Sequence, residues 1–464
     1  MSTPADTIDM RELDRLHHLH AFTDSKAMQQ DGGTRVITKA EGVYVWDSEG
    51  NRFLDGMAGL WCVSLGYGRK ELIEAAQQQL SQLPYYNTFF NCSPEVTIRL
   101  AAKLAEQTPE GITQFFFCNS GSEANDSIIK LVRLYWNLMR QPRKKMFIAR
   151  HYAYHGVTVA TASISGLTDM HPQWDLPLPN FVSHVDAPYW YKHGGDLTPD
   201  EFGIQCARAL ENRILELGPE TVAAFIGEPV YGAGGVMVPP PTYWPEVVRI
   251  CQKYDVLLCA DEVVCGFGRT GQWFGSQTFG IKPDFMTMGK GLSSGYMPIS
   301  AVGVHERIAK VLREKAGELV HGFTYSGHPV AAAVALRNLQ IIEEENLVKR
   351  VCEDIGPYFQ QKLRGLLDHP LVGEVRGIGL LGAVEIVKDK QTRETWGPET
   401  RAAFKVRGHC FANGIIMRAT RDCLYASPPL VISKTEVDEL LGTFRQCLDL
   451  TARDLGVSDF RKDA

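Results

Sequence analysis

The sequence predicts an α/β protein with a large domain built on a mostly parallel sheet and a smaller α+β domain. Short apolar runs recur between residues 114 and 304 and alternate with helical stretches, a pattern typical of strands buried on both faces of a sheet. Residues 35–55 alternate between apolar and polar side chains. After Gly327 the pattern changes to long amphipathic segments, which indicates a second lobe of α+β type.

Turn residues at 47–51 divide the alternating segment RVITKAEGVYVWDSEGNRFLD, so residues 35–55 are predicted to form a short antiparallel meander. The large sheet is predicted to follow. A helix is predicted from Tyr243 to Tyr254 between two of its strands. Six apolar runs are predicted strands: QFFFC, KMFIA, AAFIG, VLLCAD, DFMTM and ISAVGV.

In the C-terminal lobe, residues 331–345 and 355–367 are predicted helices, EVRGIGLLGAVEIV is predicted to form strands, and Thr435 to Leu455 is predicted to be the last helix. These changes of pattern predict three ranges. Residues 1–58 contribute an N-terminal segment to the small domain, residues 59–329 form the large domain, and residues 330–464 form the rest of the small domain.

The composition is that of a globular protein. With 464 residues, of which 44% are hydrophobic, the chain can bury large cores. Its 48 basic and 54 acidic residues give a net charge of −6, without the positive excess that nucleic acid or anionic lipid requires. No apolar run is long enough to cross a bilayer, so a cytoplasmic location is expected. The eleven cysteines include no Cys-x-x-Cys pair and are expected to be reduced.

Polar residues that close an apolar run are the first candidates for a site, because ligands of open α/β sheets bind beyond the carboxyl ends of the strands. Four groups have this position. They are residues 119–126 after QFFFC, Glu228 after AAFIG, Asp261 with Glu262 after VLLCA, and Lys290 after DFMTMG.

Two of these groups, residues 119–126 and Asp261, suit a ligand that carries a phosphate and a positively charged ring. The chain around Gly121 and Ser122 passes from a strand straight into a helix, which leaves amides unpaired at the positive end of the helix dipole and suits a phosphate. An ordinary N-capped helix is the alternative. The Asp261 carboxylate needs a cation or a donor to stay ionised in apolar surroundings. A protonated pyridine nitrogen would serve, and a turn cap or a pair with Arg269 is the alternative.

Lys290 is flanked by apolar residues and glycines. Burial there would desolvate the ammonium group, lower its pKa and favour formation of an imine. The alternative is a solvated surface lysine, as most lysines are.

Six motifs follow one another in the order NSGSEAND, YHG, GEPVYGAGG, ADEVVCGFGRTG, GKGLSSGYMP and HGFTYSGHP. In these motifs the chain resembles the class III aminotransferases, which use pyridoxal phosphate. Within that class, LWCVSLGYGR, YYNTFF and HPLVGEVRGIGLLGAVEIVKDK resemble the ω-amine:pyruvate branch, and in particular putrescine (diamine):pyruvate aminotransferases. The similarity runs from about His17 to the last predicted helix. It implies the type I fold of pyridoxal-phosphate-dependent transferases, with seven strands in the large sheet.

The resemblance implies that Lys290 forms the imine with pyridoxal 5′-phosphate and moves the proton during transamination, and that Asp261 pairs with the ring nitrogen. It implies a ping-pong reaction in which an amine donor and a keto acid, pyruvate, react in turn. Thr324 would reach the cofactor of a second subunit, so a homodimer with composite sites is expected, with a tetramer as the alternative. The other cofactor-binding residues that it implies are Gly121, Ser122, Tyr154, His155, Glu228 and Val263.

The resemblance also bears on the substrate. Relatives that use glutamate carry a Glu in the loop after the EP dipeptide, where this chain has Ala233. It therefore implies that Arg418 binds the carboxylate of the keto acid and moves away for an uncharged or cationic amine, with Arg421 as the alternative. The implied donor is a diamine such as putrescine. The alternatives are β-alanine and 4-aminobutyrate.

Four aromatic residues are expected to wall the substrate pocket: Phe22, Trp61, Phe89 and Tyr154. Such a wall suits amine chains or rings and can make cation–π contacts with a distal ammonium group. Core packing is the alternative for Phe22 and Phe89.

Three patterns favour other enzyme classes less strongly. GLSSG at residues 291–295 fits the nucleophile elbow of serine hydrolases with Ser293 as nucleophile, but Gly and Pro follow where the elbow requires a helix. GFGRTG and GIGLLG match a dinucleotide fingerprint, yet neither opens a helical pattern. A non-catalytic binding protein of the same fold is the last alternative, and the presence of Lys290 and Asp261 argues against it.

The histidines could suggest a metal. No acidic or cysteine partner stands at ligand spacing, so no metal site is predicted and these side chains are expected to be solvated or to cap helices. The histidines concerned are His17, His18 and His20, and the pair His151 and His155.

Overall fold

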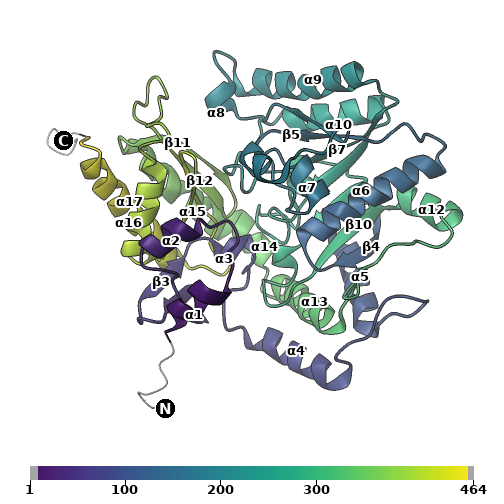
Figure 1. Ribbon diagram of the computed structural model, residues 1–464, viewed down its shortest axis with the longest axis horizontal. Coiled ribbons are helices and arrows are strands. Elements are labelled where there is room, and N and C mark those ends of the chain that lie inside the picture. The colour runs from purple at the N-terminus through teal and green to yellow at the C-terminus, as the bar shows by residue number, and fades with distance from the viewer. Residues whose placement is uncertain (1–8, 458–464) are drawn as a thin grey trace.

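The computed structural model describes residues 9–457, and Figure 1 shows a large sheet between helices beside a smaller lobe. The large sheet has seven strands in the order β4-β10-β9-β8-β7-β5-β6. Only β10 runs against its neighbours. This sheet confirms the predicted α/β class. Its strands are β4 (Ile112–Cys118), β5 (Met146–Arg150), β6 (Val182–Val185), β7 (Val222–Gly227), β8 (Leu257–Asp261), β9 (Phe285–Met288) and β10 (Ser300–His305).

All six apolar runs form strands, and the central ones are covered on both faces of the sheet, whereas β4 at one edge is partly exposed. Every residue of β7 and β8 is buried. The strand β6 is the one that the sequence did not predict. It reads VSHV and pairs only with β5, so a short edge strand with two polar residues leaves no apolar run to recognise.

Helices cover both faces of this sheet. On one face α6 (Gly121–Leu138), α7 (Val159–Ile164) and α12 (Glu306–Lys315) pack over alternate strand residues. The other face is covered by α9 (Pro199–Leu217) and α10 (Tyr243–Lys253) at one end. Towards β4 the cover consists of α4 (Lys70–Gln82), α5 (Glu95–Gln107) and α13 (Pro329–Glu344). The short helices α8 (Trp190–His193) and α11 (Gly275–Phe279) complete this part.

The smaller lobe holds two four-stranded sheets, with the orders β1-β2-β3-β13 and β11-β12-β15-β14. The first contains the predicted antiparallel meander. β13, from the C-terminal part, pairs in parallel with β3, so strands from both ends of the chain share one sheet. The division into residues 1–58, 59–329 and 330–464 stays a prediction, and α13 of the last range packs with the large sheet; residues 1–8 and 458–464 lie outside the described residues. The strands are β1 (Ile37–Glu41), β2 (Tyr44–Asp47), β3 (Arg52–Asp55), β11 (Val372–Ile378), β12 (Leu381–Ile386), β13 (Ile415–Ile416), β14 (Arg418–Thr420) and β15 (Cys423–Ala426).

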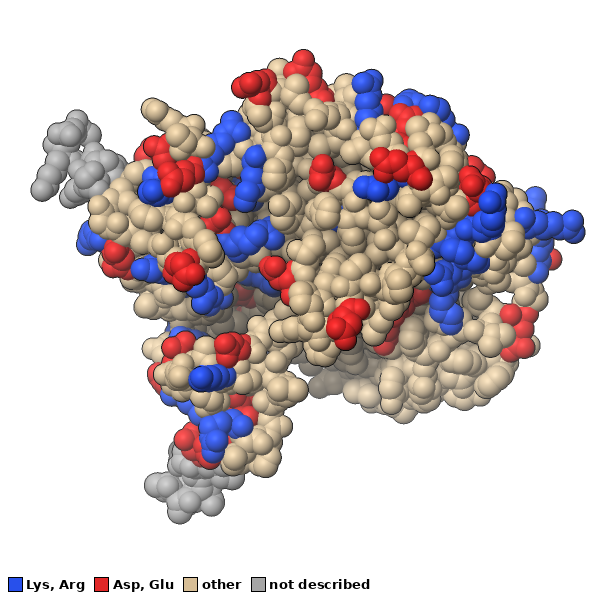
Figure 2. Space-filling view, turned by 45° about the horizontal axis from the view of Figure 1, so that its top comes forward, with Lys and Arg blue, Asp and Glu red and all other residues tan. Residues whose placement is uncertain are grey.

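Helices enclose these two sheets, and apolar side chains of α15, α16 and α17 form one core with them. The helices of this lobe and of the N-terminal segment are α1 (Met10–His17), α2 (Ser25–Gln30), α3 (Ala58–Trp61), α14 (Leu347–Arg350), α15 (Gly356–Arg364), α16 (Ala402–Ala412) and α17 (Lys434–Asp454). Within residues 9–457, no helix combines the length and the apolar character that a membrane span requires. Figure 2 shows basic and acidic side chains interspersed over one face of the molecule.

Candidate active site

The Asp261 carboxylate lies at the carboxyl end of β8, buried and held in place by three donors. Its Oδ2 accepts hydrogen bonds from Nδ1 of His155 and Nδ2 of Asn125, each at 2.8 Å. Its Oδ1 accepts from the amide of Val263 at 3.2 Å. The alternative ion pair between Asp261 and Arg269 does not form, since the Arg269 guanidinium donates to the carbonyls of Leu380 and Pro428 instead. Asp261 is therefore fixed, with its charge directed into the site.

Lys290 lies two residues beyond β9 and lines the same cavity as Asp261. Its Nζ is 5.1 Å from the centre of the Trp61 ring. Burial lowers the pKa of the Lys290 ammonium group, while the nearby carboxylates of Asp261 and Glu228 oppose that shift. The backbone of Lys290 has φ +43°, a left-handed conformation that a side-chain-bearing residue keeps only when its surroundings impose it. The chain therefore presents a partly desolvated amine to the cavity.

The amides of Gly121 and Ser122 begin α6, where backbone N–H groups lack intrahelical acceptors. Ser120 caps the helix, its Oγ accepting from the Glu123 amide at 3.2 Å. The lack of a side chain at Gly121 matters, since a Cβ there would lie 3.1 Å from the Val263 side chain. The helix is capped in the ordinary way, and Gly121 and Ser122 also border the cavity. Phosphate binding by their amides stays a prediction.

Tyr154 and Glu228 form another wall of the cavity. Glu228 Oε1 accepts from the Tyr154 amide at 3.2 Å, and Oε2 accepts from the Gly232 amide at 2.7 Å. Burial raises the pKa of the Glu228 carboxyl group, and burial also raises the pKa of the Tyr154 hydroxyl group. The Glu228 side chain thus links the loop that contains Tyr154 to the loop that contains Ala233.

Arg418 and Arg421 point to different places. The Arg418 guanidinium carbon lies 5.3 Å from the centre of the Trp61 ring, on the site side. Arg421 instead donates to the Gly234 carbonyl at 2.7 Å and lies 4.6 Å from the centre of the Tyr152 ring. Ala233 is buried in one apolar cluster with Trp61. Of the two arginines, Arg418 is the one beside the Trp61 ring that faces Lys290. Its binding of a carboxylate stays a prediction.

Six predicted site residues do not line this cavity within one chain. Trp61, Ala233 and Arg418 lie beside it, whereas the other three lie elsewhere. Phe22 is 74% exposed. Thr324 is exposed on a turn, and its carbonyl accepts from the Tyr85 hydroxyl at 2.8 Å. Phe89 packs against Phe90 and beside Gly322, near the Thr324 turn. Of the expected aromatic wall, Tyr154 lines the cavity and Trp61 lies beside it, with its ring facing Lys290 Nζ.

The alternative patterns do not gain support. The Ser293 hydroxyl donates to the Met297 carbonyl at 2.5 Å, and turns rather than a helix lead from it to β10. The GFGRTG glycines lie in turns, and GIGLLG forms the hairpin between β11 and β12. A nucleophile elbow and a dinucleotide loop are therefore absent at these positions.

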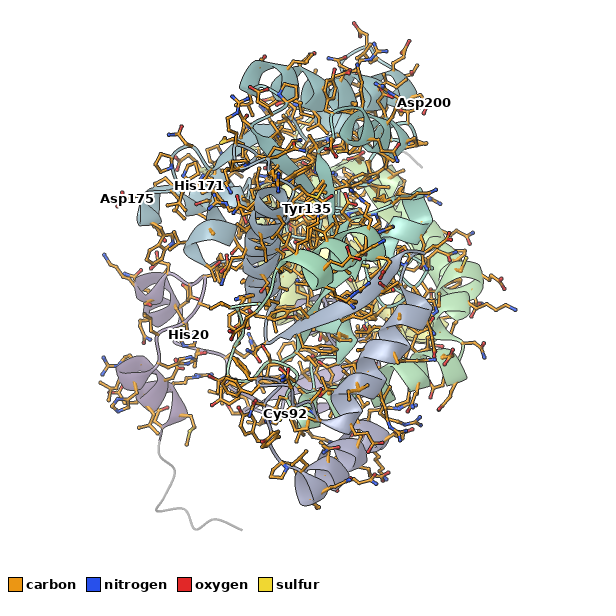
Figure 3. All side chains as sticks on the ribbon, turned by 90° about the vertical axis from the view of Figure 1, so that its right-hand side faces the viewer. His20, Cys92, Tyr135, His171, Asp175 and Asp200 are labelled. Carbon is orange, nitrogen blue, oxygen red and sulfur yellow. The ribbon has the colours of Figure 1, made fainter. Side chains whose placement is uncertain are left out.

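Two expectations about histidines were wrong. His155 is neither solvated nor a cap, because it is buried against Asp261. The Asp14 carboxylate accepts from His18 Nδ1 at 3.0 Å and from His20 Nε2 at 2.8 Å, so an acidic side chain does accompany these histidines. Figure 3 shows His20 on the N-terminal segment, away from the large sheet. Asp14 lies four residues before His18, so one turn of helix brings the two side chains together. The prediction from the sequence did not take this spacing into account.

Two residues of the site were not singled out from the sequence, although one of them, Asn125, lies in the candidate group of residues 119–126. Asn125 joins Asp261 to the carbonyl of His155, and Thr287 Oγ1 donates to Asn125 Oδ1 at 2.5 Å. Asn125 lies on the buried face of α6 among apolar side chains. A polar residue at an apolar position of the helix was the signal that could have identified it.

Comparison with known proteins places this site in a family. The model of the class III aminotransferases matches residues 26–448. The chain is a class III aminotransferase. Enzymes of this class use pyridoxal phosphate, so the cofactor expected from the sequence is confirmed.

Individual relatives of this aminotransferase cover nearly its whole length. It is 53% identical to a putrescine–pyruvate aminotransferase of Pseudomonas aeruginosa, over 97% of this chain and 98% of that one. It is 45% identical to a γ-aminobutyrate transaminase of Solanum lycopersicum, over 90% of this chain and 82% of that one. The ω-transaminase of Pseudomonas jessenii in complex with PMP superimposes with a TM-score of 0.94 at 45% identity, covering 97% and 100% of the two chains.

The described residues of the aminotransferase fit pyridoxal phosphate. Nε2 of His155 is buried without a hydrogen-bond partner, beside the carboxylate that a protonated ring nitrogen requires. Gly156 has φ +138°, and a Cβ there would lie 2.6 Å from Ser122 Oγ, so only glycine leaves the approach to the start of α6 open. An amine, a carboxylate and free helix amides therefore border one cavity.

Proposed function

We propose that this aminotransferase transfers the amino group of a diamine such as putrescine to pyruvate. Pyridoxal phosphate, when bound, supplies an aldehyde that combines with amines and a ring that withdraws electrons. Lys290 then accepts and returns the proton of the substrate carbon, because burial favours its neutral amine form. Asp261, held by His155 and Asn125, keeps a proton on the ring nitrogen.

The other roles follow from position. Gly121 and Ser122 would hold the phosphate with the amides of the first turn of α6. Tyr154 and Val263 would contact the two faces of the ring. Glu228 would act on the cofactor indirectly, because it fixes the backbone of Tyr154.

The donor is the part of the proposal that relies most on the relatives. The putrescine–pyruvate aminotransferase shares 53% of its residues with this chain over 97% of the chain, and this observation carries the proposal. Ala233 supports it, because an alanine supplies no carboxylate that could neutralise Arg418 when the substrate lacks a second carboxylate. The Trp61 ring adds a surface for an alkyl chain or a distal ammonium group.

Formation of alanine from pyruvate tests the donor directly. The purified holoenzyme is assayed with putrescine, β-alanine, 4-aminobutyrate, an arylalkylamine and glutamate at equal concentrations. Putrescine is expected to give the highest kcat/KM. A preference for 4-aminobutyrate would favour the activity named for the Solanum lycopersicum relative, and a preference for glutamate would contradict the proposal.

Replacement of Arg418 by Ala is expected to raise the KM for pyruvate about 100-fold, because an Arg–carboxylate pair in a partly buried site is lost. The KM for putrescine is expected to change less than about threefold, since a diamine offers no carboxylate. Steady-state kinetics with each substrate varied in turn measures both values. Equal increases for pyruvate and putrescine would show that Arg418 shapes the pocket and does not bind the carboxylate.

We further propose a homodimer with two composite sites. Thr324, Phe89 and Phe22 lie outside the cavity of their own chain, as expected if they serve the site of a second chain. Large apolar side chains near the Thr324 turn are exposed in the single chain, and such a patch favours contact with another subunit. The exposed residues are Tyr85, Tyr86, Phe90, Leu319, Val320 and Tyr325.

Mixing two inactive variants tests the composite site. Lys290→Ala disables a chain's own cavity, and Thr324→Glu is expected to repel the phosphate held by the partner chain. After mixed refolding, about half of the dimers should be heterodimers with one intact site, so activity should return to about one quarter of the unmodified level. Each variant refolded alone is the control. A heterodimer that forms and stays inactive would place Thr324 in its own chain's site.

A further inference from the structure

The loop of residues 232–236, which carries Ala233, is a strained segment beside the substrate wall. Val236 has φ +47° and Gly235 has φ +127°. A β-branched residue in the left-handed region is a rare outlier that persists only when surrounding contacts impose it. The large domain holds one side of this loop through Glu228, which accepts from the Gly232 amide at 2.7 Å.

Three side chains of the C-terminal sheet hold the other side. They donate to three consecutive carbonyl groups of the loop. Tyr425 Oη donates to the Ala233 carbonyl at 3.1 Å, and Arg421 Nη2 donates to the Gly234 carbonyl at 2.7 Å. Arg376 donates to the Gly235 carbonyl from Nε at 2.9 Å and from Nη2 at 2.7 Å.

These donors are themselves fixed. The Arg376 side chain is 9% exposed and pairs with Glu374 at 2.6 Å and Glu385 at 3.0 Å. The ring of Tyr425 stacks on Trp61, with centroids 6.1 Å apart and planes at 30°. The loop carbonyls are thus connected through Tyr425 to an aromatic residue that faces Lys290.

Arg421 carries the strongest evidence that its side chain matters. With Asp422 it forms the two-residue turn between β14 and β15, and its φ is +51°. Glycine, Asn or Asp suits such a turn better. An arginine there strains the backbone, and its side chain offsets that strain through the Gly234 carbonyl and the Tyr152 ring.

We propose that Arg376, Arg421 and Tyr425 are positioning residues that fix the carbonyls of residues 233–235 and thereby set the length of amine that fits between Ala233 and Trp61. They act through the loop and do not contact the cofactor. The inference rests on the proposed use of a diamine donor but not on putrescine in particular, because its test compares diamines of different length with one another.

The test is Arg421→Gly in the holoenzyme, with Arg393→Gly as the matched control. Arg393 also has a positive φ, +60°, and donates to a backbone carbonyl, but that carbonyl belongs to Tyr191, outside the loop. Alanine formation is measured with diamines of three to six carbons. Melting temperature and absorbance of the bound cofactor are measured on the same samples.

For Arg421→Gly we expect an unchanged or higher melting temperature, because glycine relieves the turn, and unchanged cofactor absorbance. The KM for the preferred diamine should rise about tenfold with kcat within about twofold, and the preference for one chain length should weaken. Tyr425→Phe, which removes only the hydroxyl group, should shift the length preference in the same way. The proposal is wrong if both variants keep the length profile of the parent, or if Arg393→Gly alters it equally.

Discussion

Lys290→Ala is expected to lower the rate of transamination about 10⁴-fold, the upper range for loss of a positioned acid–base group. The neutral amine of Lys290 is the group in the cavity that can take the substrate proton, and burial lowers its pKa towards the range in which that form is populated. The same variant should lose the covalent link to the cofactor. Alanine formation and the intact mass of the borohydride-reduced protein measure the two effects.

Lys144→Ala provides the matched control. Lys144 is another lysine whose pKa burial lowers, and its Nζ donates to the Asp255 carbonyl at 2.5 Å, outside the site. Its loss is expected to leave the rate within about threefold and the cofactor adduct intact. If Lys290→Ala turned over at the parent rate, the assignment of the proton transfer to this amine would be refuted.

Asp261→Asn is expected to lower kcat by about 10²–10³-fold, because the charge that keeps the ring nitrogen protonated is removed while the shape of the side chain is kept. His155 and Asn125 would then face an amide in place of a carboxylate. Kinetics of the first half-reaction, followed by the absorbance of the bound cofactor, separates this effect from a change in substrate binding.

Asp284→Asn is the corresponding control. Asp284 is buried near the start of β9 and bonds Arg307 at 2.6 Å and the Leu258 amide at 3.0 Å. This substitution should lower the melting temperature without lowering kcat by more than about threefold. A parent-like kcat for Asp261→Asn would mean that another group protonates the ring.

The sequence predicted the large sheet and the two principal site residues because both depend on local pattern. An apolar run followed by Asp261 or Lys290 identifies a strand and its carboxyl end without knowledge of the rest of the fold. The edge strand β6 gave no such run. Local pattern was sufficient wherever burial on both faces imposed it.

Contacts between distant segments could not be predicted in this way. His155 and Asn125 meet at Asp261 from two different elements, and each alone has the appearance of an ordinary polar residue. Arg421 and Arg418 differ by three positions, yet one donates to the loop of residues 232–236 and the other faces Trp61. Which of the two arginines faces the site depends on the hairpin between β14 and β15, and a single sequence does not fix the register of that hairpin.

The parallel pairing of β3 with β13 has a consequence for biosynthesis. Residues 52–55 emerge from the ribosome early, but their partner at residues 415–416 emerges only after the whole large sheet has been made. Chain segments fold largely in the order in which they appear, and such long-range closure is slow. The amino-terminal strands therefore wait, with one edge unpaired, until synthesis is nearly complete, and nascent chains stopped before residue 415 should expose that edge to proteases and to aggregation.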